Sequence, residues 1–204
     1  MNASAAYAQL LELGVATVET GDVASKFRLS TTAATKLLAR LAAARLIMRL
    51  RPGLWLLSRT APSVYTLVEP LSSPFPSYVS LQSALYSHGM IEQVPSIVFA
   101  ISLGRTRKLR TQIGSFSYHH IAPELFDGFA IGSDDVKLAV PEKALFDMAY
   151  MSGGRTREFA HVPELELPNR FRRSLIDRWL ARIPASRRRS MTAQRINAIL
   201  ARAA

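Results

Sequence analysis

Hydroxyl and basic side chains recur along one side of a predicted helix near the start of the chain, where they could contact nucleic acid. Over residues 31–44, apolar residues recur at helical spacing on one side. Slim polar side chains let a helix approach the base edges of a major groove, and cations attract phosphates. The spacing therefore predicts a DNA-recognition helix whose contacts come from Thr31, Thr32, Thr35, Lys36 and Arg40.

Side chains that could support catalysis or bind a metal lack a suitable arrangement. His119 and His120 are adjacent, so in a strand they point to opposite faces. Glu142 and Asp147 are separated by about 140° around a helix. The chain has no cysteine, which excludes thiol nucleophiles, disulfides and thiolate metal sites, and it has no glycine-rich phosphate loop. We expect no enzymatic activity, no metal and no cofactor.

The elements before the recognition helix complete a helix-turn-helix. A first helix over residues 5–13 ends at Gly14. Thr20 is predicted to cap a second helix that continues through Phe27, and Ser30 to cap the recognition helix.

A predicted β-hairpin follows, with its turn at Pro52 and Gly53. Arg49 and Arg51 are two residues apart, which predicts side chains on one face of a wing that contacts the DNA backbone. Residues 1–60 thus read as a winged helix-turn-helix. The alternative is that this order of elements serves protein contacts and that the arginines are ordinary solvated charges.

Charge is unevenly distributed among the 204 residues. The net charge is +11 overall, but it is +5 over residues 1–60, −2 over residues 61–150 and +8 over residues 151–204. Two basic ends around an acidic middle favour separate surfaces with separate partners, nucleic acid first among them. The alternative is a genome that favours arginine.

The remaining chain predicts a second domain of the α+β class. Prolines and serines over residues 61–77 indicate a linker. Within residues 78–204, a helix over 81–88 precedes mostly antiparallel strands over 94–103, 111–121, 126–131 and 136–140, and Pro141 begins another helix. A helix over 169–183 follows, and Ser190 or Thr192 is expected to cap a last helix.

Four segments, in order, resemble the AbiEi-type antitoxins of abortive-infection toxin–antitoxin systems. They are YVSLQSALYSHG at 78–89, RTR at 105–107, GSFSYHHI at 114–121 and AVPEKALFDMAY at 139–150. The resemblance implies a protein that binds operator repeats in double-stranded DNA, represses its own promoter and counteracts a nucleotidyltransferase-like toxin, directly or indirectly. It also makes an oligomer on DNA possible.

A second basic segment joins two predicted strands in the middle of the chain. Arg105, Arg107, Lys108 and Arg110 could contact phosphate or an acidic partner, although a solvated loop tip explains them equally well. The arginines after residue 169 belong to helices with apolar faces, and their role stays open.

Two other function classes remain in view. One is an ordinary winged-helix regulator whose C-terminal domain senses a ligand or forms dimers, and the other is an RNA-processing or nucleotide-transferring enzyme. No apolar run approaches the roughly 18 residues of a membrane helix, and the first residues lack the pattern of a signal peptide. We therefore expect a cytoplasmic protein without membrane contact.

Overall fold

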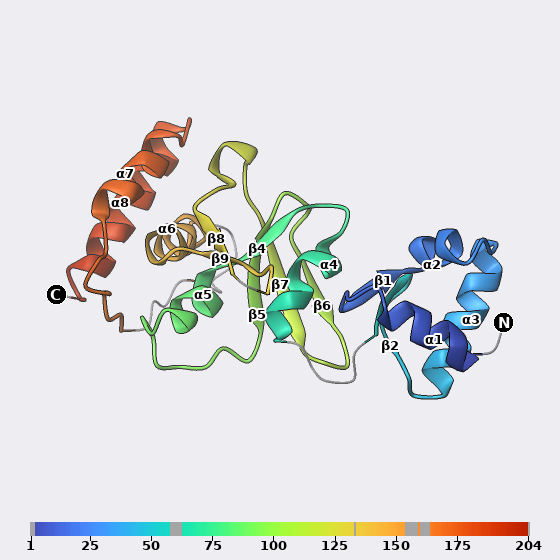
Figure 1. Cartoon of the computed structure of the whole chain (residues 1–204). Helices are drawn as coiled ribbons and strands as arrows, with labels where there is room; N and C mark the ends of the chain where they lie inside the picture. The colour runs from blue at the N-terminus through green and yellow to red at the C-terminus, as the bar shows by residue number, and fades with distance from the viewer. Residues whose placement is uncertain (1–2, 58–62, 133, 154–158, 160–163, 204) are drawn as a thin grey trace. The chain divides into compact units, whose positions relative to one another are not determined.

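The chain folds into two compact units, which are described separately. The computed structural model describes residues 3–57, 63–132, 134–153, 159 and 164–203 (Figure 1). The N-terminal unit comprises residues 1–71 and 111–113, and the C-terminal unit comprises residues 72–110 and 114–204.

Over residues 3–57, the N-terminal unit combines three helices with a small antiparallel sheet. The elements of this segment are α1 (Ala3–Leu11), β1 (Thr17–Glu19), α2 (Thr20–Lys26), α3 (Thr31–Ala43), β2 (Met48–Arg51) and β3 (Leu54–Leu56). The strand order is β1-β3-β2, and both pairings are antiparallel. This order of helices followed by a hairpin is consistent with a winged helix-turn-helix.

The starts of α2 and α3 depend on their capping residues. Ser30 caps α3 as predicted, because its side chain accepts a hydrogen bond from the Ala33 amide at 3.2 Å. The prediction that Thr20 caps α2 was wrong. Glu19 is the capping residue, and it forms a reciprocal capping box with Asp22.

Residues in the predicted linker form regular structure where they are described. The 3-10 helix η1 (Val64–Leu67) and the short helix α4 (Val68–Ser72) precede β4 (Ser77–Val79), and all three residues of β4 are buried. Residues 58–62 lie outside the described part of the chain.

The C-terminal unit is built on a mixed six-stranded sheet with the order β6-β7-β5-β4-β9-β8. Its remaining strands are β5 (Val98–Ser102), β6 (Arg107–Arg110), β7 (Ser115–His120), β8 (Phe129–Ile131) and β9 (Lys137–Ala139). Three of the five pairings are antiparallel, whereas β4 with β9 and β5 with β7 are parallel. The predicted α+β class with mostly antiparallel strands is therefore confirmed.

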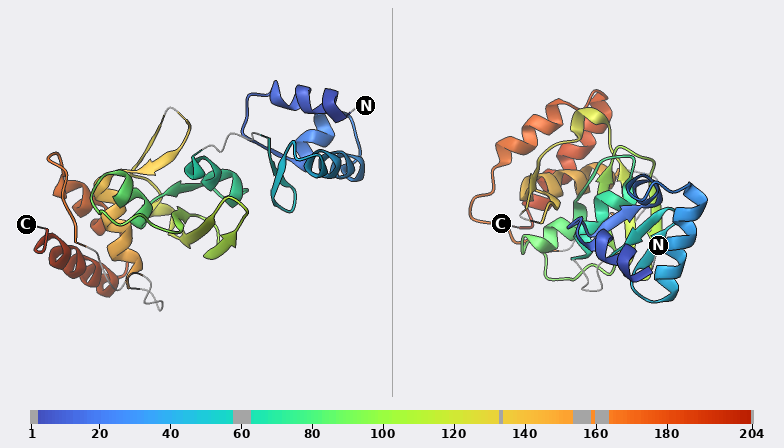
Figure 2. Two further views of the ribbon diagram at one scale, coloured as in Figure 1. Left: turned by 90° about the horizontal axis from the view of Figure 1, so that it is seen from below. Right: turned by 45° about the vertical axis from the view of Figure 1, so that its right-hand side comes forward.

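Four helices and a 3-10 turn complete the described part of this unit. They are α5 (Leu81–Ser87), η2 (Pro123–Leu125), α6 (Pro141–Met151), α7 (Arg173–Ala181) and α8 (Ser186–Leu200). Helix α6 contacts α5, α7 and α8, and Figure 2 shows the last two helices beside it. Nine consecutive residues of α6, from Glu142 to Tyr150, are buried. Helix α6 is therefore the central helix of the unit.

The start of α8 corrects a prediction. The helix begins at Ser186, so Arg187, Arg188 and Arg189 belong to its first turn, and neither Ser190 nor Thr192 caps it. Instead, the buried Thr192 hydroxyl donates to the Arg188 carbonyl at 2.8 Å inside the helix. A serine or threonine at helical spacing does not by itself reveal whether it caps a helix or bonds within one.

Candidate nucleic-acid interface

Helix α3 has two chemically distinct sides. Its apolar side enters the core of the N-terminal unit, where Ala34, Leu38 and Leu41 have no exposed surface and Leu37 is 2% exposed. Residues of α1 and α2 pack against it. Because the buried side fixes the rotation of the helix, the opposite side must face solvent.

All five residues predicted to contact DNA from α3 are exposed: Thr31, Thr32, Thr35, Lys36 and Arg40. Ala39 and Ala43 lie on the same side and are also exposed, so no bulky apolar side chain stands on it. The Thr35 hydroxyl donates to the Thr31 carbonyl at 2.8 Å, which fixes its orientation while its oxygen still accepts hydrogen bonds. Neither Lys36 nor Arg40 forms an ion pair with another described residue, so both cations are available to a partner.

The two wing arginines point to opposite faces, contrary to the prediction. A β-bulge separates them, so Arg49 lies opposite Trp55 while Arg51 lies opposite Leu54. Trp55 and Leu54 are adjacent in β3, and adjacent strand residues face opposite ways. The bulge interrupts the alternation of side-chain directions along β2. A spacing of two residues therefore does not place Arg51 on the same face as Arg49.

The environments of these two arginines differ accordingly. Arg49 is exposed, and its guanidinium carbon lies 5.7 Å from the centre of the Trp55 ring. The Arg51 guanidinium is 3.3 Å from Glu19 Oε1 and 3.4 Å from the Pro70 carbonyl. Arg49 is thus the wing cation presented to solvent, whereas Arg51 holds the wing to β1 and α4.

The second basic segment is an edge strand, not the predicted loop between strands. Arg107 and Lys108 lie in β6 at one edge of the sheet, with Arg110 at its end and Arg105 just before it, and all four are exposed. Arg107 faces Tyr118 and stacks over its ring at 5.6 Å, whereas Lys108 points to the other face. These cations are divided between two faces, and charge along an edge also blocks pairing with other strands. Their contact with phosphate or an acidic partner stays a prediction.

The other titratable residues considered from sequence have internal partners. The buried His119 lies 2.9 Å from the Ser117 hydroxyl, while the adjacent His120 is exposed, as expected for neighbours in a strand. Glu142 accepts a hydrogen bond from the Arg172 amide at 2.7 Å. Across the described residues, no three His, Cys, Asp or Glu side chains are grouped as a metal site would require.

Sequence reasoning missed a buried charge cluster in the C-terminal unit, made of Tyr78, Ser80, Lys143 and Asp147. Lys143 and Asp147 are four residues apart on α6, and neither side chain has any exposed surface. Lys143 Nζ donates to Asp147 Oδ1. Asp147 Oδ2 accepts hydrogen bonds from the Tyr78 hydroxyl at 2.9 Å and the Ser80 hydroxyl at 2.8 Å. The cluster therefore ties β4 and the start of α5 to α6.

The surroundings of Lys143 are aromatic. Its Nζ lies 5.5 Å from the ring centre of Tyr78, 5.0 Å from Phe146 and 5.6 Å from Trp179. Burial lowers the pKa of Lys143 and raises the pKa of Asp147, and in both cases it outweighs the attraction between the two charges. Burial also raises the pKa of Tyr78 well above its usual value. No substrate can reach these groups without local opening, so the cluster acts as a clamp between elements.

A signal for this cluster exists in the sequence. Residues 144–150 are apolar on every side of the helix apart from Asp147. A helix that is apolar all round must be buried all round, so a charge within it needs a buried partner. Lys143, at the i,i+4 spacing, is the nearest candidate.

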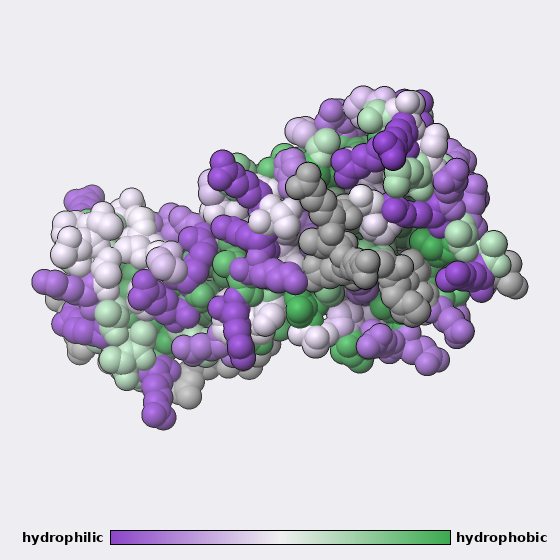
Figure 3. Space-filling view, turned by 180° about the vertical axis from the view of Figure 1, so that it is seen from behind, coloured by the Kyte–Doolittle hydropathy of each residue, from purple (hydrophilic) through white to green (hydrophobic). Residues whose placement is uncertain are grey.

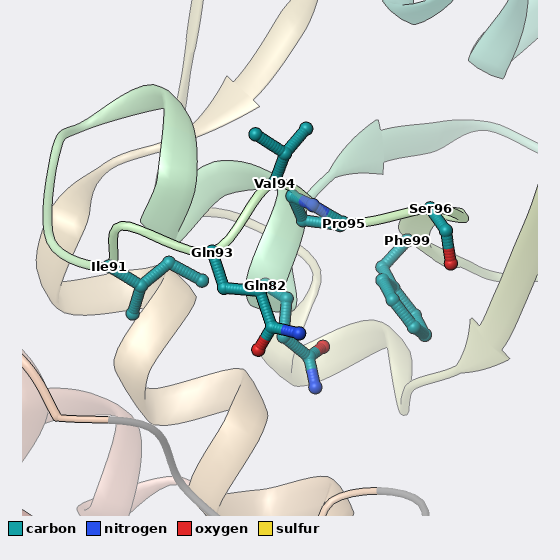
Figure 4. Close-up of a pocket in the computed structure, with 7 residues that line it drawn as sticks. All are labelled: Gln82, Ile91, Gln93, Val94, Pro95, Ser96 and Phe99. Atoms are coloured by element: carbon teal, nitrogen blue, oxygen red, sulfur yellow. The ribbon is translucent and has the colours of Figure 1, made fainter.

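A small open pocket lies between the first turn of α5 and the segment that leads into β5 (Figure 4). Its volume is about 310 Å³, and Ile91, Val94, Pro95 and Phe99 supply its apolar lining. Gln82, Gln93 and Ser96 add polar groups, and no described lining residue is charged. The Gln82 Oε1 atom is shielded from solvent and has no hydrogen-bond partner among the described residues. Such a pocket suits an uncharged molecule with a hydrogen-bond donor.

The arginines of α7 and α8 have mixed surroundings, and the surface in Figure 3 shows hydrophilic residues interspersed with apolar ones. Arg182 pairs with Asp127 at 2.6 Å, Arg188 stacks on the Tyr150 ring at 3.7 Å, and Arg189 donates to the Ile183 carbonyl. Several of these cations therefore support local structure.

The chain was compared with known families and with curated proteins, and no family model or curated sequence matches it. Among the described helices, none has both the length and the apolar character required to span a bilayer.

Proposed function

We propose that the protein binds double-stranded DNA through the N-terminal unit and represses transcription of its own operon as an antitoxin. In this proposal α3 enters a major groove, and Arg49 on the wing contacts the neighbouring phosphate backbone. Thr31, Thr32 and Thr35 supply hydroxyls near the base edges, while Lys36 and Arg40 supply positive charge.

One observation supports this proposal above the others. The five predicted contact residues are all exposed on one side of a helix whose other side is buried in the core. This outer side combines small residues, hydroxyls and cations that have no ion-pair partner among the described residues. An unobstructed, slim and cationic side is what a major groove admits.

The antitoxin part of the proposal depends on the resemblance of four ordered segments to AbiEi-type proteins. Two of them contain the buried charge cluster: Tyr78 and Ser80 come from the first, and Lys143 and Asp147 from the last. These two of the four segments therefore meet in the core of the C-terminal unit. In this proposal the segments stabilise the fold of the C-terminal unit, and that unit presents the surface that contacts the toxin.

DNA binding can be tested by titrating duplex DNA from the region upstream of the protein's own reading frame at several salt concentrations. Lys36→Ala should weaken binding and reduce the magnitude of the log–log salt slope by about 0.9, as expected for one lost phosphate contact. Arg202→Ala serves as the matched control, since it removes one exposed charge from the C-terminal unit. Equal slopes for wild type and Lys36→Ala would refute the assigned contact.

The antitoxin role requires a separate experiment. The neighbouring gene, if it encodes a nucleotidyltransferase-like protein, should arrest growth when expressed alone and allow growth when co-expressed with this chain. Lys36→Ala should still rescue growth when its expression is driven from a foreign promoter, because the lesion affects DNA contact only. Growth arrest that persists with the wild-type chain present would rule out the antitoxin role.

A ligand-responsive transcriptional regulator is the second candidate, and the pocket beside Gln82 favours it. A regulator of this kind would bind an uncharged molecule there and change its affinity for DNA. Gln82→Leu, which removes the unpaired acceptor, should abolish that response without altering DNA binding in the absence of ligand. A screen of uncharged amides by thermal shift, compared between wild type and Gln82→Leu, provides the measurement.

A further inference from the structure

Two arginines of the N-terminal unit occupy backbone positions that favour glycine. Arg28 has a φ of +50° and Arg45 a φ of +56°, so both lie in the left-handed region. This conformation is costly for any residue with a Cβ, because the Cβ approaches the following carbonyl oxygen. Four non-glycine residues of the described chain have a positive φ, and Arg28 and Arg45 are the two that carry a cation.

The two arginines stand at equivalent places, because α2 and α3 end in the same hydrogen-bond pattern. After α2, the amides of Arg28 and Leu29 donate to the carbonyls of Ser25 and Ala24 at 3.2 and 2.9 Å. At Arg45 the same two bonds measure 2.9 and 3.0 Å. This is the Schellman motif, in which the residue that follows the cap is left-handed and is usually glycine.

A helix of the C-terminal unit ends in the same motif with glycine in place. After α5, the amides of Gly89 and Met90 donate to the carbonyls of Tyr86 and Leu85, each at 2.9 Å, and Gly89 has a φ of +67°. Arginine replaces glycine in this motif at the ends of α2 and α3, the two helices of the helix-turn-helix order. The preference of the backbone therefore does not account for the two arginines.

The surroundings of the arginines do not account for them either. Both side chains are exposed, and neither forms an ion pair with another described residue. The apolar contact of each motif comes from the next residue, Leu29 or Leu46, which packs against the core. An exposed cation gains a favourable interaction with the negative end of a helix, but this gain is smaller than the cost of a left-handed backbone.

Arg28 and Arg45 flank α3, the helix proposed to enter the major groove. Arg28 precedes Thr31, the first residue of α3, and Arg45 follows Ala43, the last. The 13 residues of α3 make a helix about 20 Å long. The major groove is about 12 Å wide. A helix of this length in the groove extends to the phosphates that border it, so cations at both of its ends would lie beside the DNA backbone.

We propose that Arg28 and Arg45 contact DNA phosphates at the two ends of α3 and thereby fix the position of this helix in the groove. The inference rests on the proposed DNA binding and adds two contacts to it. A guanidinium group suits this role, because its planar donors can bind two phosphate oxygens at once. Phosphate contacts set affinity and register, whereas the residues on the outer side of α3 would read the bases.

Glycine substitution tests the proposal, because it removes the cation and also relieves the backbone. Arg28→Gly and Arg45→Gly should melt at or above the temperature of wild type, since glycine adopts a positive φ without steric cost. Each variant should nevertheless bind upstream duplex DNA more weakly. The magnitude of the log–log salt slope should fall by about 0.9 in each variant and by about 1.8 in the double variant. Salt titrations and thermal unfolding of the full-length chain provide the two measurements.

Two kinds of control separate the lost contact from other effects of the substitution. Arg202→Gly removes an exposed arginine from the C-terminal unit and should leave the salt slope unchanged. Arg28→Lys and Arg45→Lys keep the positive charge at the two positions, so they should retain the wild-type slope.

The outcomes distinguish this inference from the proposed function. An unchanged salt slope in either glycine variant would overturn the contact at both ends of α3. A melting temperature below that of wild type would assign the arginine to the fold and would also overturn the proposal. If wild type binds DNA and Lys36→Ala lowers the slope while the glycine variants do not, the proposed function stands and this inference fails. Absence of binding by wild type would reject both.

Discussion

Lys36 and Lys143 are both helical lysines, yet their surroundings are opposite. Lys36 lies on the exposed side of α3 and has no ion-pair partner among the described residues. Lys143 has no exposed surface, pairs with Asp147 and is surrounded by three aromatic rings. The role of each lysine therefore depends more on the environment of its helix than on the charge itself. A two-sided helix leaves its cation exposed to solvent, whereas an all-apolar helix uses its cation to connect elements.

The energetic consequence should differ just as much. An exposed and unpaired cation contributes little to the free energy of unfolding, so evolution can adjust it for binding. A buried ion pair costs desolvation energy, but once it is formed, removal of one partner leaves an uncompensated charge in the core. Four predictions test this difference.

Lys143→Ala should have the largest effect. Removal of Lys143 leaves the Asp147 carboxylate buried without its cation, which is expected to cost about 3–5 kcal/mol of unfolding free energy. Urea denaturation followed by circular dichroism measures this loss. The double variant Lys143→Met with Asp147→Asn removes both charges but keeps an acceptor for Tyr78 and Ser80, so it should regain most of the stability. A double variant no more stable than Lys143→Ala would contradict this account.

Gly128→Ala should follow in size. Gly128 has a φ of +77°, and a Cβ there would lie 2.5 Å from Trp179 Cζ2 and 3.0 Å from the Lys143 side chain. Left-handed backbone alone costs a non-glycine residue roughly 1–2 kcal/mol, and the clash adds to it. Gly89→Ala is the matched control, since its φ is +67° with no atom within 4 Å of the added Cβ. Thermal unfolding should separate the two variants, and equal losses would show that the aromatic packing around Lys143 is not tight.

Tyr78 should make stability depend on pH in the alkaline range. Burial raises its folded-state pKa well above 10.0, so its contribution is fully present below pH 10 and is lost as pH rises through the folded-state value. The maximum slope for one such group is about 1.4 kcal/mol per pH unit. Wild type should therefore lose unfolding free energy above pH 10 more steeply than Tyr78→Phe. Parallel curves for the two proteins in urea titrations would remove Tyr78 as the cause.

Lys36→Ala and Arg40→Ala should have the smallest effect on stability. Because both side chains are exposed and unpaired among the described residues, the free energy of unfolding should stay within about 0.5 kcal/mol of wild type. Any loss of DNA affinity would then reflect a lost contact instead of a damaged fold. A loss of 2 kcal/mol or more of unfolding free energy in either variant would show that its side chain stabilises the fold, which would contradict this prediction.

Local chemistry allowed much of the fold to be predicted from sequence. The Ser30 cap, the hairpin turn at Pro52 and Gly53, and the start of α6 at Pro141 all depend on a few adjacent residues. Predictions failed where a serine or threonine hydroxyl can either cap a helix or form a hydrogen bond with another part of the fold. Thr20 was expected to cap α2, but its hydroxyl accepts a hydrogen bond from Trp55 at 3.0 Å. Ser80 directly precedes α5, yet its side chain accepts no capping hydrogen bond from the helix, and its hydroxyl donates to Asp147 instead.

Features that depend on distant residues could not be predicted in the same way. The basic run at Arg105 to Arg110 resembled a loop because its cations gave no apolar alternation, and only pairing with β7 makes it a strand. The bulge that separates Arg49 from Arg51 depends on how β2 fits against β3. The buried charge cluster joins residues 67 and 69 positions apart. The outer side of α3 was predictable because it depends on one helical period alone.

The parallel pairing of β4 with β9 carries a consequence for synthesis on the ribosome. Val79 lies opposite Leu138, so β4 must wait for much of the C-terminal unit to be translated before its sheet can close. The ring of Trp179, which packs against Lys143, arrives later still. The elements from α1 to β3 are complete by residue 56. A nascent chain would thus have completed α1 to β3 while its remaining length still exposed apolar strands, which is the stage at which chaperones bind unfolded segments.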